Sequence, residues 1–500
     1  MNNLRTLTYF EIYKKNARHL GTACALHCNG KNTTHSELFE QTAQFAAGLK
    51  TLGFTPGSRI AVLCKNHPVF FHLFGAASAL NLTLVLVNRR LSPEELAHVI
   101  EDTTPRAIFC DPDMTPQAEA LCSQSDSLSH MFVVDDTEDH FTALYSHPPI
   151  RSAETISDTD PFVIIHTAAV MGKPRGAVLS QTNVVLANQQ MIQMFGLDAS
   201  KAYLNILPLF HIMGVNLGLG TLQAGGKNVI QDKFDAAKAL ELIRDQGISL
   251  FGSFPPILTT LLTEMENQSA DLSSLDKVVG LEAPDTAKTW ETQTGSTFWT
   301  LYGQTETSGI VSTSPYFEKT GSAGRIAPLT DIRTADDTDR LLQADQVGEI
   351  LVRGPLVFQG YWNADELNEQ TFRTGWHHTG DLGMIDEQGF LFFKGRKPEK
   401  ELIKPGGENV FPAEVEKTIL MNDAVKEVCV FGVPDKKFGE GIKAVCALNQ
   451  GSELTKDELI EFCGRHIAGY KKPRYVQFID ALPKTEDGRV DREQIKTDYT

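Results

Sequence analysis

The chain has 500 residues and a formal net charge of −17 at pH 7, which together predict a large acidic body with a smaller second domain. So acidic a chain does not suit a nucleic-acid groove, which gains affinity from basic side chains. The amino terminus lacks an apolar core of signal-peptide length, and no run of about 18 apolar residues occurs, so neither a leader nor a membrane-spanning helix is expected.

The eight cysteines are scattered along the chain. Cys24, His27 and Cys28 bring three potential metal ligands together, but no second pair stands at the spacing of a zinc site. Free thiols in a reducing compartment, the cytoplasm, are therefore the favoured interpretation.

Up to about residue 330, short apolar runs alternate with helical patterns. One helix is predicted to begin at Ser92-Pro93-Glu94-Glu95, a capping box with proline at the first helical position. Such alternation predicts mostly parallel sheets with helices on their faces. The runs expected to be buried strands are Arg59–Leu63, Leu84–Val87, Ala107–Cys110, Met131–Val134 and Phe162–His166.

The last third of the chain changes character. Residues 330–395 contain short strands and turns, which predict a small antiparallel sheet or barrel. A charged stretch then marks a boundary, followed by helices expected at 412–421 and 455–467 and strands at 427–432 and 443–448. The predicted fold is α/β, with a large N-terminal domain (1–396) of mostly parallel αβα sheets and a small β-barrel, a hinge (397–401), and a small mobile α+β C-terminal domain (402–500).

Two segments suggest a place for phosphates and a reactive group. Thr167 to Gly176 follows a predicted strand, and its glycines and basic side chains (Gly172, Lys173, Arg175, Gly176) suit a phosphate-holding loop, although a plain surface turn fits as well. His211 follows an apolar strand end at the edge of a predicted cleft, but a lone histidine is more often structural than catalytic.

Two further segments suit a nucleotide. Tyr302 to Thr307 offers an aromatic ring for a purine and the Glu306 carboxylate for a magnesium ion with phosphates, although a capped turn is the plainer interpretation. Asp381, after a glycine at a strand edge, can accept both hydroxyls of a ribose or form an ordinary aspartate turn. Glycine-bearing charged loops at 406–416 and 482–492 could close over such a site.

Taken together, in this order and spacing, the motifs resemble the adenylate-forming superfamily of acyl-CoA synthetases, peptide-synthetase adenylation domains and luciferases. The resemblance covers nearly the whole chain, including Gly348-Glu349-Ile350 and Gly360-Tyr361-Trp362. It implies that a small-molecule carboxylic acid attacks the α-phosphate of ATP, with Mg²⁺, and that a thiol, coenzyme A, takes the acyl group after the small domain rotates. Oligomeric state cannot be read from these motifs.

The resemblance also assigns roles to individual residues. His211, Thr305 and Arg489 would be catalytic, Glu306 would bind magnesium, and Lys400 and Glu401 would form the hinge. Residues implied to contact ATP or coenzyme A are Thr167, Gly172, Lys173, Arg175, Gly176, Gly280, Glu282, Ala283, Pro284, Tyr302, Gly303, Gln304, Thr305, Asp381, Arg396, Gly407, Glu408 and Lys472, with the wider region Lys471–Arg474 facing coenzyme A. Residues implied to line the acyl pocket are His211, Gly280, Leu281, Gly303 and Gly309.

The chain departs from the family pattern at two places. Ala168 to Met171 remove most hydroxyls from the phosphate loop, and Arg489 stands where a lysine usually bridges the substrate carboxylate and the α-phosphate. Arginine keeps the charge but is wider and planar. The predicted function is an AMP-forming acyl-CoA synthetase, an acid–thiol ligase, and the alternatives are a ligase that loads a carrier protein or a catalytically reduced nucleotide-binding homologue.

Substrate size is the last inference from the sequence. Acetate-specific relatives carry tryptophan where Gly303 stands, so a two-carbon specialist is not expected. Leu281 stands where the family usually has a small residue. If the Leu281 side chain faces the acyl pocket, the pocket is shorter. That would favour a short or medium acyl chain or a compact cyclic acid.

Overall fold

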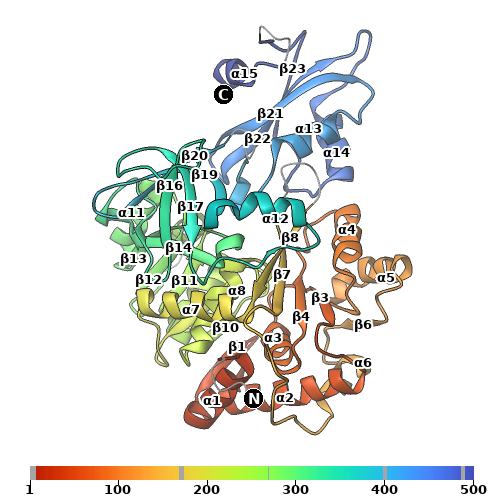
Figure 1. The fold of residues 1–500 in the computed structure, drawn as a ribbon, viewed down its shortest axis with the longest axis vertical. Helices are drawn as coiled ribbons and strands as arrows, with labels where there is room; N and C mark the ends of the chain where they lie inside the picture. Colours follow the sequence, from red (N-terminus) through yellow and green to blue (C-terminus); the bar gives the residue numbers. More distant parts are fainter. Residues whose placement is uncertain (1–6, 168–173, 268–269, 398–401, 486–489) are drawn as a thin grey trace.

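The computed structural model describes residues 7–167, 174–267, 270–397, 402–485 and 490–500 (Figure 1). Within these ranges, two large sheets form the body of the molecule, with strand orders β15-β14-β13-β12-β11-β9-β10-β1-β2 and β18-β8-β7-β4-β3-β5-β6. The strands of the first sheet are β1 Cys24–Cys28, β2 Lys31–Thr34, β9 Ala202–Asn205, β10 Lys227–Ile230, β11 Leu250–Ser253, β12 Lys277–Gly280, β13 Thr297–Gln304, β14 Gly309–Pro315 and β15 Arg325–Ile326.

The second sheet contains all five predicted strands. Its strands are β3 Arg59–Leu63, β4 Thr83–Leu86, β5 Ala107–Cys110, β6 His130–Val133, β7 Pro161–Thr167, β8 Arg175–Ser180 and β18 Gly360–Tyr361. The pairs β3–β4, β3–β5, β5–β6 and β4–β7 are parallel. Because β3, β4 and β5 lie inside the sheet and are covered on both faces, their sequences are continuous apolar runs, and the prediction of mostly parallel sheets is confirmed.

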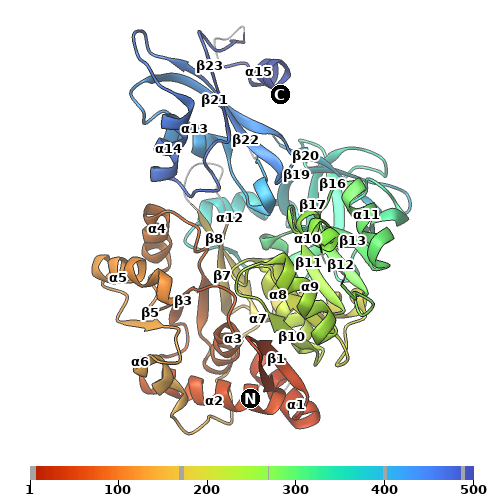
Figure 2. The same ribbon diagram turned by 180° about the vertical axis from the view of Figure 1, so that it is seen from behind.

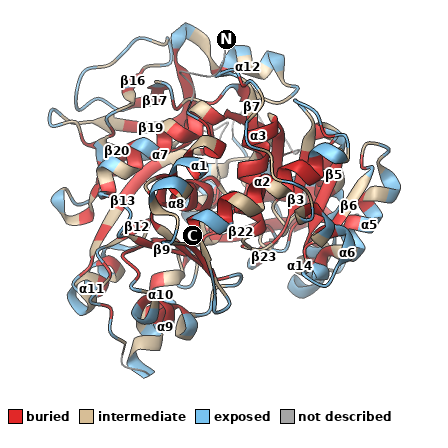
Figure 3. Ribbon diagram, turned by 90° about the horizontal axis from the view of Figure 1, so that it is seen from below, coloured by how far each residue is buried: buried red, intermediate tan, exposed pale blue. Residues whose placement is uncertain are grey.

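Helices cover the sheets and fill the space between them. They are α1 Tyr9–Leu20, α2 His35–Thr51, α3 Val69–Leu80, α4 Pro93–Thr103, α5 Thr115–Gln124, α6 Asp139–Thr142, α7 Gln181–Phe195, α8 Ile212–Gln223, α9 Ala236–Gln246, α10 Ile257–Asn267, α11 Pro284–Thr294 and α12 Asp365–Thr371. Helices α3 and α8 are buried along their whole length and share one apolar core with strands of both sheets. The burial colouring shows this for α3 (Figure 3). No helix among the described residues has the length and apolarity needed to cross a membrane.

A small antiparallel sheet, as predicted for 330–395, lies between the body and the end of the chain. Its order is β16-β17-β19-β20, so β16 and β20 are its edges. The strands are β16 Asp331–Ala335, β17 Gly348–Arg353, β19 His377–Ile385 and β20 Leu391–Arg396. Strand β18, from the same stretch, pairs instead with β8 of the seven-stranded sheet, which ties this region to the body.

The C-terminal domain is a smaller α+β unit above the body (Figures 1 and 2). Its elements are α13 Pro412–Ile419, β21 Val425–Asp435, β22 Gly439–Leu448, α14 Lys456–His466, β23 Tyr475–Ile479 and α15 Arg492–Tyr499. The predicted helices and strands all occur, and β21 and β22 are longer than expected because they form one continuous antiparallel pair. The domain has apolar clusters of its own, which is the expected property of a separate folding unit.

Candidate active site

A cavity of about 930 Å³ lies between the N-terminal body and the C-terminal domain. Its floor includes residues at the carboxyl ends of β12 and β13, which is where ligands bind in open α/β sheets. The sequence-predicted residues that line it are Thr167, Arg175, His211, Leu281, Glu282, Tyr302, Gly303, Gln304, Thr305, Glu306, Gly309, Asp381, Arg396 and Gly407.

Asp381 is the centre of a dense polar network in this cavity. It lies on β19, and its side chain is almost fully buried. One carboxylate oxygen accepts hydrogen bonds from the Tyr302 hydroxyl at 2.8 Å and from the Gln304 amide at 2.7 Å. The other pairs with Arg396 Nε at 2.8 Å. With three donors fixing it, this carboxylate is held rigidly at the cavity wall.

The Tyr302 ring forms a flat apolar surface beside that network. It stacks near Phe393, with ring centroids 6.3 Å apart and an interplanar angle of 30°. Burial, and then the negative charge of Asp381, raise the pKa of the Tyr302 hydroxyl far above its usual value. The hydroxyl therefore stays protonated and donates, while the ring remains available to a planar ligand.

Glu306 faces the strand that leads into the predicted phosphate loop. It lies in the short helix η3 (Thr305–Thr307), and its Oε1 accepts from the Tyr361 hydroxyl at 2.8 Å and from Thr167 Oγ1 at 3.4 Å. The cation of Arg175 lines the cavity nearby. A carboxylate with neighbouring hydroxyls is the oxygen-rich ligand set that Mg²⁺ prefers, so these residues fit a magnesium ion bound with phosphates.

Tyr361 has a role at the site that the sequence did not predict. It is in β18, whose pairing with β8 places it opposite Ala177 and so brings it to the phosphate-loop side of the cavity. Burial and the charge of Glu306 raise the pKa of its hydroxyl, which keeps it a donor. The segment Gly360-Tyr361-Trp362 was part of the family resemblance, but nothing in its spacing indicated a contact with Glu306.

The side of the cavity at which the acyl pocket was predicted is mostly apolar. Leu281, Met213 and Phe254 line it, and His211 stands at the N-cap of α8. Burial lowers the pKa of His211, so the imidazole is neutral at pH 7. Burial also raises the pKa of Glu282 to about 7, opposed by a hydrogen bond from Ser253 Oγ.

The C-terminal domain contributes the loop that contains η7 (Pro405–Gly407). Gly407 and Asn409 line the cavity, and Glu408 lies outside its lining, where it pairs with Arg90 of the body at 2.6 Å. Lys404 also lines the cavity, and burial lowers its pKa to about 8. The sequence did not predict Lys404 or Phe254 as site residues, because their place depends on how the two domains meet.

Several predicted residues have other positions. Gly280 is buried at the end of β12, where an added Cβ would lie 1.6 Å from the Ser253 carbonyl oxygen, so its role is close strand packing. Lys471, expected near coenzyme A, is buried in an ion cluster. The predicted residues outside the cavity lining are Gly176, Gly280, Ala283, Pro284, Glu408 and Lys472. The predicted residues outside the described residues are Gly172, Lys173, Lys400, Glu401 and Arg489, together with Ala168 to Met171.

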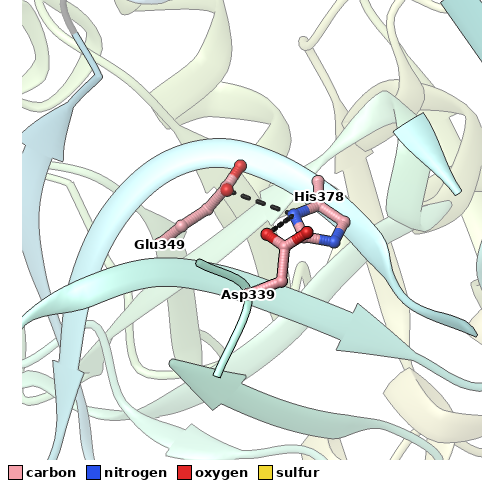
Figure 4. Close-up of side chains that lie close together, drawn as sticks. All are labelled: Asp339, Glu349 and His378. Carbon is pink, nitrogen blue, oxygen red and sulfur yellow. Dashed lines mark hydrogen bonds and ion pairs between the residues drawn. The ribbon is translucent and has the colours of Figure 1, made fainter. Parts of the chain in front are cut away.

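A second polar cluster lies in the small sheet. Asp339, Glu349 and His378 come together there, as Figure 4 shows, with His378 Nδ1 3.1 Å from Glu349. The carboxylates already have cationic partners, since Arg373 pairs with Asp339 at 2.9 Å and Lys397 with Glu349 at 3.1 Å. Burial opposes ionisation of Glu349, but the hydrogen bonds from His378 and Lys397 outweigh the effect of burial and lower the pKa of Glu349 to about 2. The negative charges of the cluster are therefore offset by cationic side chains of the same region, which is typical of a structural ion network.

Comparison with known proteins places this fold and site in a family. The model of "AMP-binding enzyme" matches residues 13–362, and that of its C-terminal domain matches residues 414–489. The chain therefore belongs to the AMP-binding enzyme family, whose members form adenylates. Within it the chain is similar to AMP-forming CoA ligases, which use a carboxylic acid, ATP, coenzyme A and Mg²⁺.

Three similar proteins illustrate the group. A feruloyl-CoA synthase from Amycolatopsis sp is 30% identical, covering 96% of this chain and 97% of its own. An indoleacetate–CoA ligase from Aromatoleum aromaticum is 31% identical, covering 93% of both chains. The third is o-succinylbenzoate CoA synthetase from Bacillus subtilis, which has been solved in more than one complex.

The Bacillus subtilis enzyme resembles this chain to different degrees in two of its structures. A double mutant bound with a product analogue matches with a TM-score of 0.85, 27% identity and 97% coverage of both chains. The complex with AMP matches with a TM-score of 0.70, 26% identity, and coverage of 97% of this chain and 98% of its own. The chain as a whole thus superposes better on the first structure.

Proposed function

We propose that the protein is an AMP-forming acyl-CoA synthetase that activates a compact acid, aromatic or of medium chain length. The observation that supports this most strongly is a single cavity lined by Asp381, Glu306, Leu281 and Gly407. A nucleotide-binding carboxylate, a magnesium ligand, an acyl pocket and a loop of the C-terminal domain thereby meet at one place.

The nucleotide side suits ATP. Adenine would stack on the Tyr302 ring, and the ribose hydroxyls would donate to Asp381, which Arg396 and Gln304 hold in position. Glu306 would hold the magnesium ion, whose charge reduces the repulsion between the substrate carboxylate and the phosphates. Attack at phosphorus then depends on alignment and charge, which the cavity walls supply, rather than on a strong base.

The acyl side supports a compact substrate. Leu281 lines the cavity at a position where the family usually carries a small residue, and a larger side chain there would limit the depth available to the acyl group. Two relatives are named for the aromatic acids ferulate and indoleacetate, which supports a compact aromatic substrate. Neutral His211 suits the wall of such a pocket because it adds no charge to repel or attract an apolar acyl group.

The proposed docking place of coenzyme A is a second cavity of about 460 Å³ on the C-terminal domain. Lys472 and Arg474 line it with Phe438 and Tyr470, and the Arg474 guanidinium lies 4.0 Å from the centre of the Phe438 ring. Cations beside aromatic rings suit the phosphates and the adenine of the coenzyme.

The eight cysteines are all free, which agrees with a reducing compartment such as the cytoplasm.

The experiment incubates the purified protein with ATP, Mg²⁺ and a panel of carboxylic acids, with and without coenzyme A. AMP release that depends on both an acid and coenzyme A is the expected result. Adenylate that accumulates although coenzyme A is present would indicate a carrier-protein ligase. Absence of pyrophosphate with every acid, despite ATP binding, would indicate a catalytically reduced homologue.

Arg489 can be tested in the same assay. If arginine replaces the usual lysine at some cost in geometry, Arg489→Lys should release pyrophosphate faster than the wild-type protein with the preferred acid. An unchanged or slower rate would mean that the surrounding site is adapted to arginine.

A further inference from the structure

A buried lysine joins the two domains on the side of the molecule next to α4. Lys471, in the C-terminal domain, is only 1% exposed. Its ammonium group lies 2.7 Å from Glu414 Oε1 of α13 in the same domain and also bonds Glu95 Oε1 of α4 in the body. Two carboxylates that come from different domains therefore share one cation.

The charges of this cluster are held in place from several directions. The carboxylates outweigh the effect of burial and raise the pKa of Lys471, so the lysine is charged. Glu95 is fixed by the α4 capping box, in which its Oε2 accepts from the Ser92 backbone N–H at 2.7 Å. A buried ammonium group needs partners of this kind, and separating the domains would leave Glu95 without its cation.

Contacts on the same side of the molecule, next to α4, also position the loop that enters the active-site cavity. Arg90, just before α4, pairs with Glu408, and the neighbouring residues Gly407 and Asn409 line the cavity. The Glu95–Lys471 bond thus holds the C-terminal domain where this loop faces the acyl pocket. The chain as a whole also superposes better on the relative's product-analogue complex than on its AMP complex.

We infer that Lys471 and Glu95 are positioning residues for thiol transfer: their buried ion pair holds the C-terminal domain in the arrangement that receives coenzyme A. This inference rests on the proposed two-step function. Lys471 lines neither the active-site cavity nor the cavity assigned to coenzyme A. It acts through Gly407 and its neighbours, and the adenylation step, which precedes domain rotation, does not require the pair.

The sharpest variant is Glu95→Gln. It keeps a side chain that can accept from Ser92, and it leaves the Lys471–Glu414 pair inside the C-terminal domain intact. Lys471→Met is the more obvious change, but it leaves two buried carboxylates unpaired and can unfold the domain. Glu94→Gln is the matched control, because Glu94 is the adjacent, exposed carboxylate on the same turn of α4.

The two half-reactions are measured separately with an acid that the wild-type protein activates. Adenylation is followed by ATP–pyrophosphate exchange, and thiol transfer by mixing preformed enzyme-bound adenylate with coenzyme A. Glu95→Gln should slow thiol transfer at least tenfold and change adenylation less than twofold, while Glu94→Gln changes neither. Equal rates in Glu95→Gln and wild type, or equal slowing of both steps, would overturn the inference.

A second measurement needs no activity. Small-angle X-ray scattering of the wild-type protein and of Glu94→Gln should match the profile calculated from this structure, and that of Glu95→Gln should depart from it. If the wild-type protein activates no acid, the proposed function fails, and scattering still decides whether Glu95 holds the domain. Indistinguishable profiles for all three proteins would then refute the positioning role.

Discussion

The hydroxyl of Tyr302 donates a 2.8 Å hydrogen bond to the buried carboxylate of Asp381, which joins the end of β13 to the middle of β19. One residue offers a ring and the other an acceptor, and the bond fixes their separation. We predict that Asp381→Asn raises KM for ATP by roughly 10–100-fold, because a hydrogen bond to a charged group is worth about 1.5–3 kcal/mol. Steady-state kinetics at varied ATP concentration measures this.

Tyr302→Phe is the matched comparison for that change. It keeps the ring and removes the hydroxyl with its hydrogen bonds to Asp381 and Thr379, but leaves the carboxylate, so the increase in KM for ATP should be smaller than for Asp381→Asn. The opposite order would show that the hydroxyl, rather than the carboxylate, makes the main contact with the nucleotide.

Removing the charge of Glu306 should stop turnover without unfolding the protein. Glu306→Gln keeps the size of the side chain and can still accept from Tyr361, so a melting temperature close to that of the wild-type protein is expected. Pyrophosphate release should fall below detection even at high magnesium concentration, because the amide is a poor ligand for Mg²⁺. Normal turnover in this variant would refute the magnesium assignment.

Shortening Leu281 should change which acids are activated. Leu281→Ala deepens the acyl side of the cavity, so kcat/KM for a longer acid should rise relative to a shorter one by on the order of tenfold, the effect of a methylene or more in an apolar pocket. KM for ATP is the internal control and should not change. An unaltered ranking of acids would place the acyl group elsewhere in the cavity.

Glu349 should make the free energy of unfolding depend on pH in the acid range. Its pKa is about 2 in the folded protein against an ordinary value of 4.5, so the unfolded chain binds the proton more tightly. The contribution, on the order of 3 kcal/mol, is fully present above pH 4.5 and is lost as pH falls toward 2. Urea unfolding across this range, compared with Glu349→Gln, measures it; parallel pH profiles for the two proteins would contradict the assignment.

The sequence predicted the elements well where the local pattern and the buried environment agree. Strands β3, β4 and β5 are continuous apolar runs because both of their faces are covered, and α4 begins at its capping box. Tyr302 and Asp381, which line the cavity, were likewise predicted as site residues, since each belongs to a motif with its own spacing.

The remaining site residues depend on tertiary contacts that no local pattern encodes. Lys471 and Lys472 are adjacent lysines, yet one is buried between two carboxylates and the other lines a cavity. Charge alone cannot distinguish them before the domains are docked. Tyr361 reaches Glu306 only because β18 joins a sheet distant in sequence.

The contacts of Glu349 also anchor the end of the N-terminal body, where the chain turns toward the C-terminal domain. Glu349 pairs with Lys397, and the Lys397 backbone N–H donates to the Gly380 carbonyl, one residue before Asp381. Lys397, the last described residue before the C-terminal domain, is thus anchored next to Asp381 on the cavity wall. If the C-terminal domain rotates about this point, as the proposed function requires, its parts farther from Lys397 would move more than those beside it, because displacement grows with distance from the pivot.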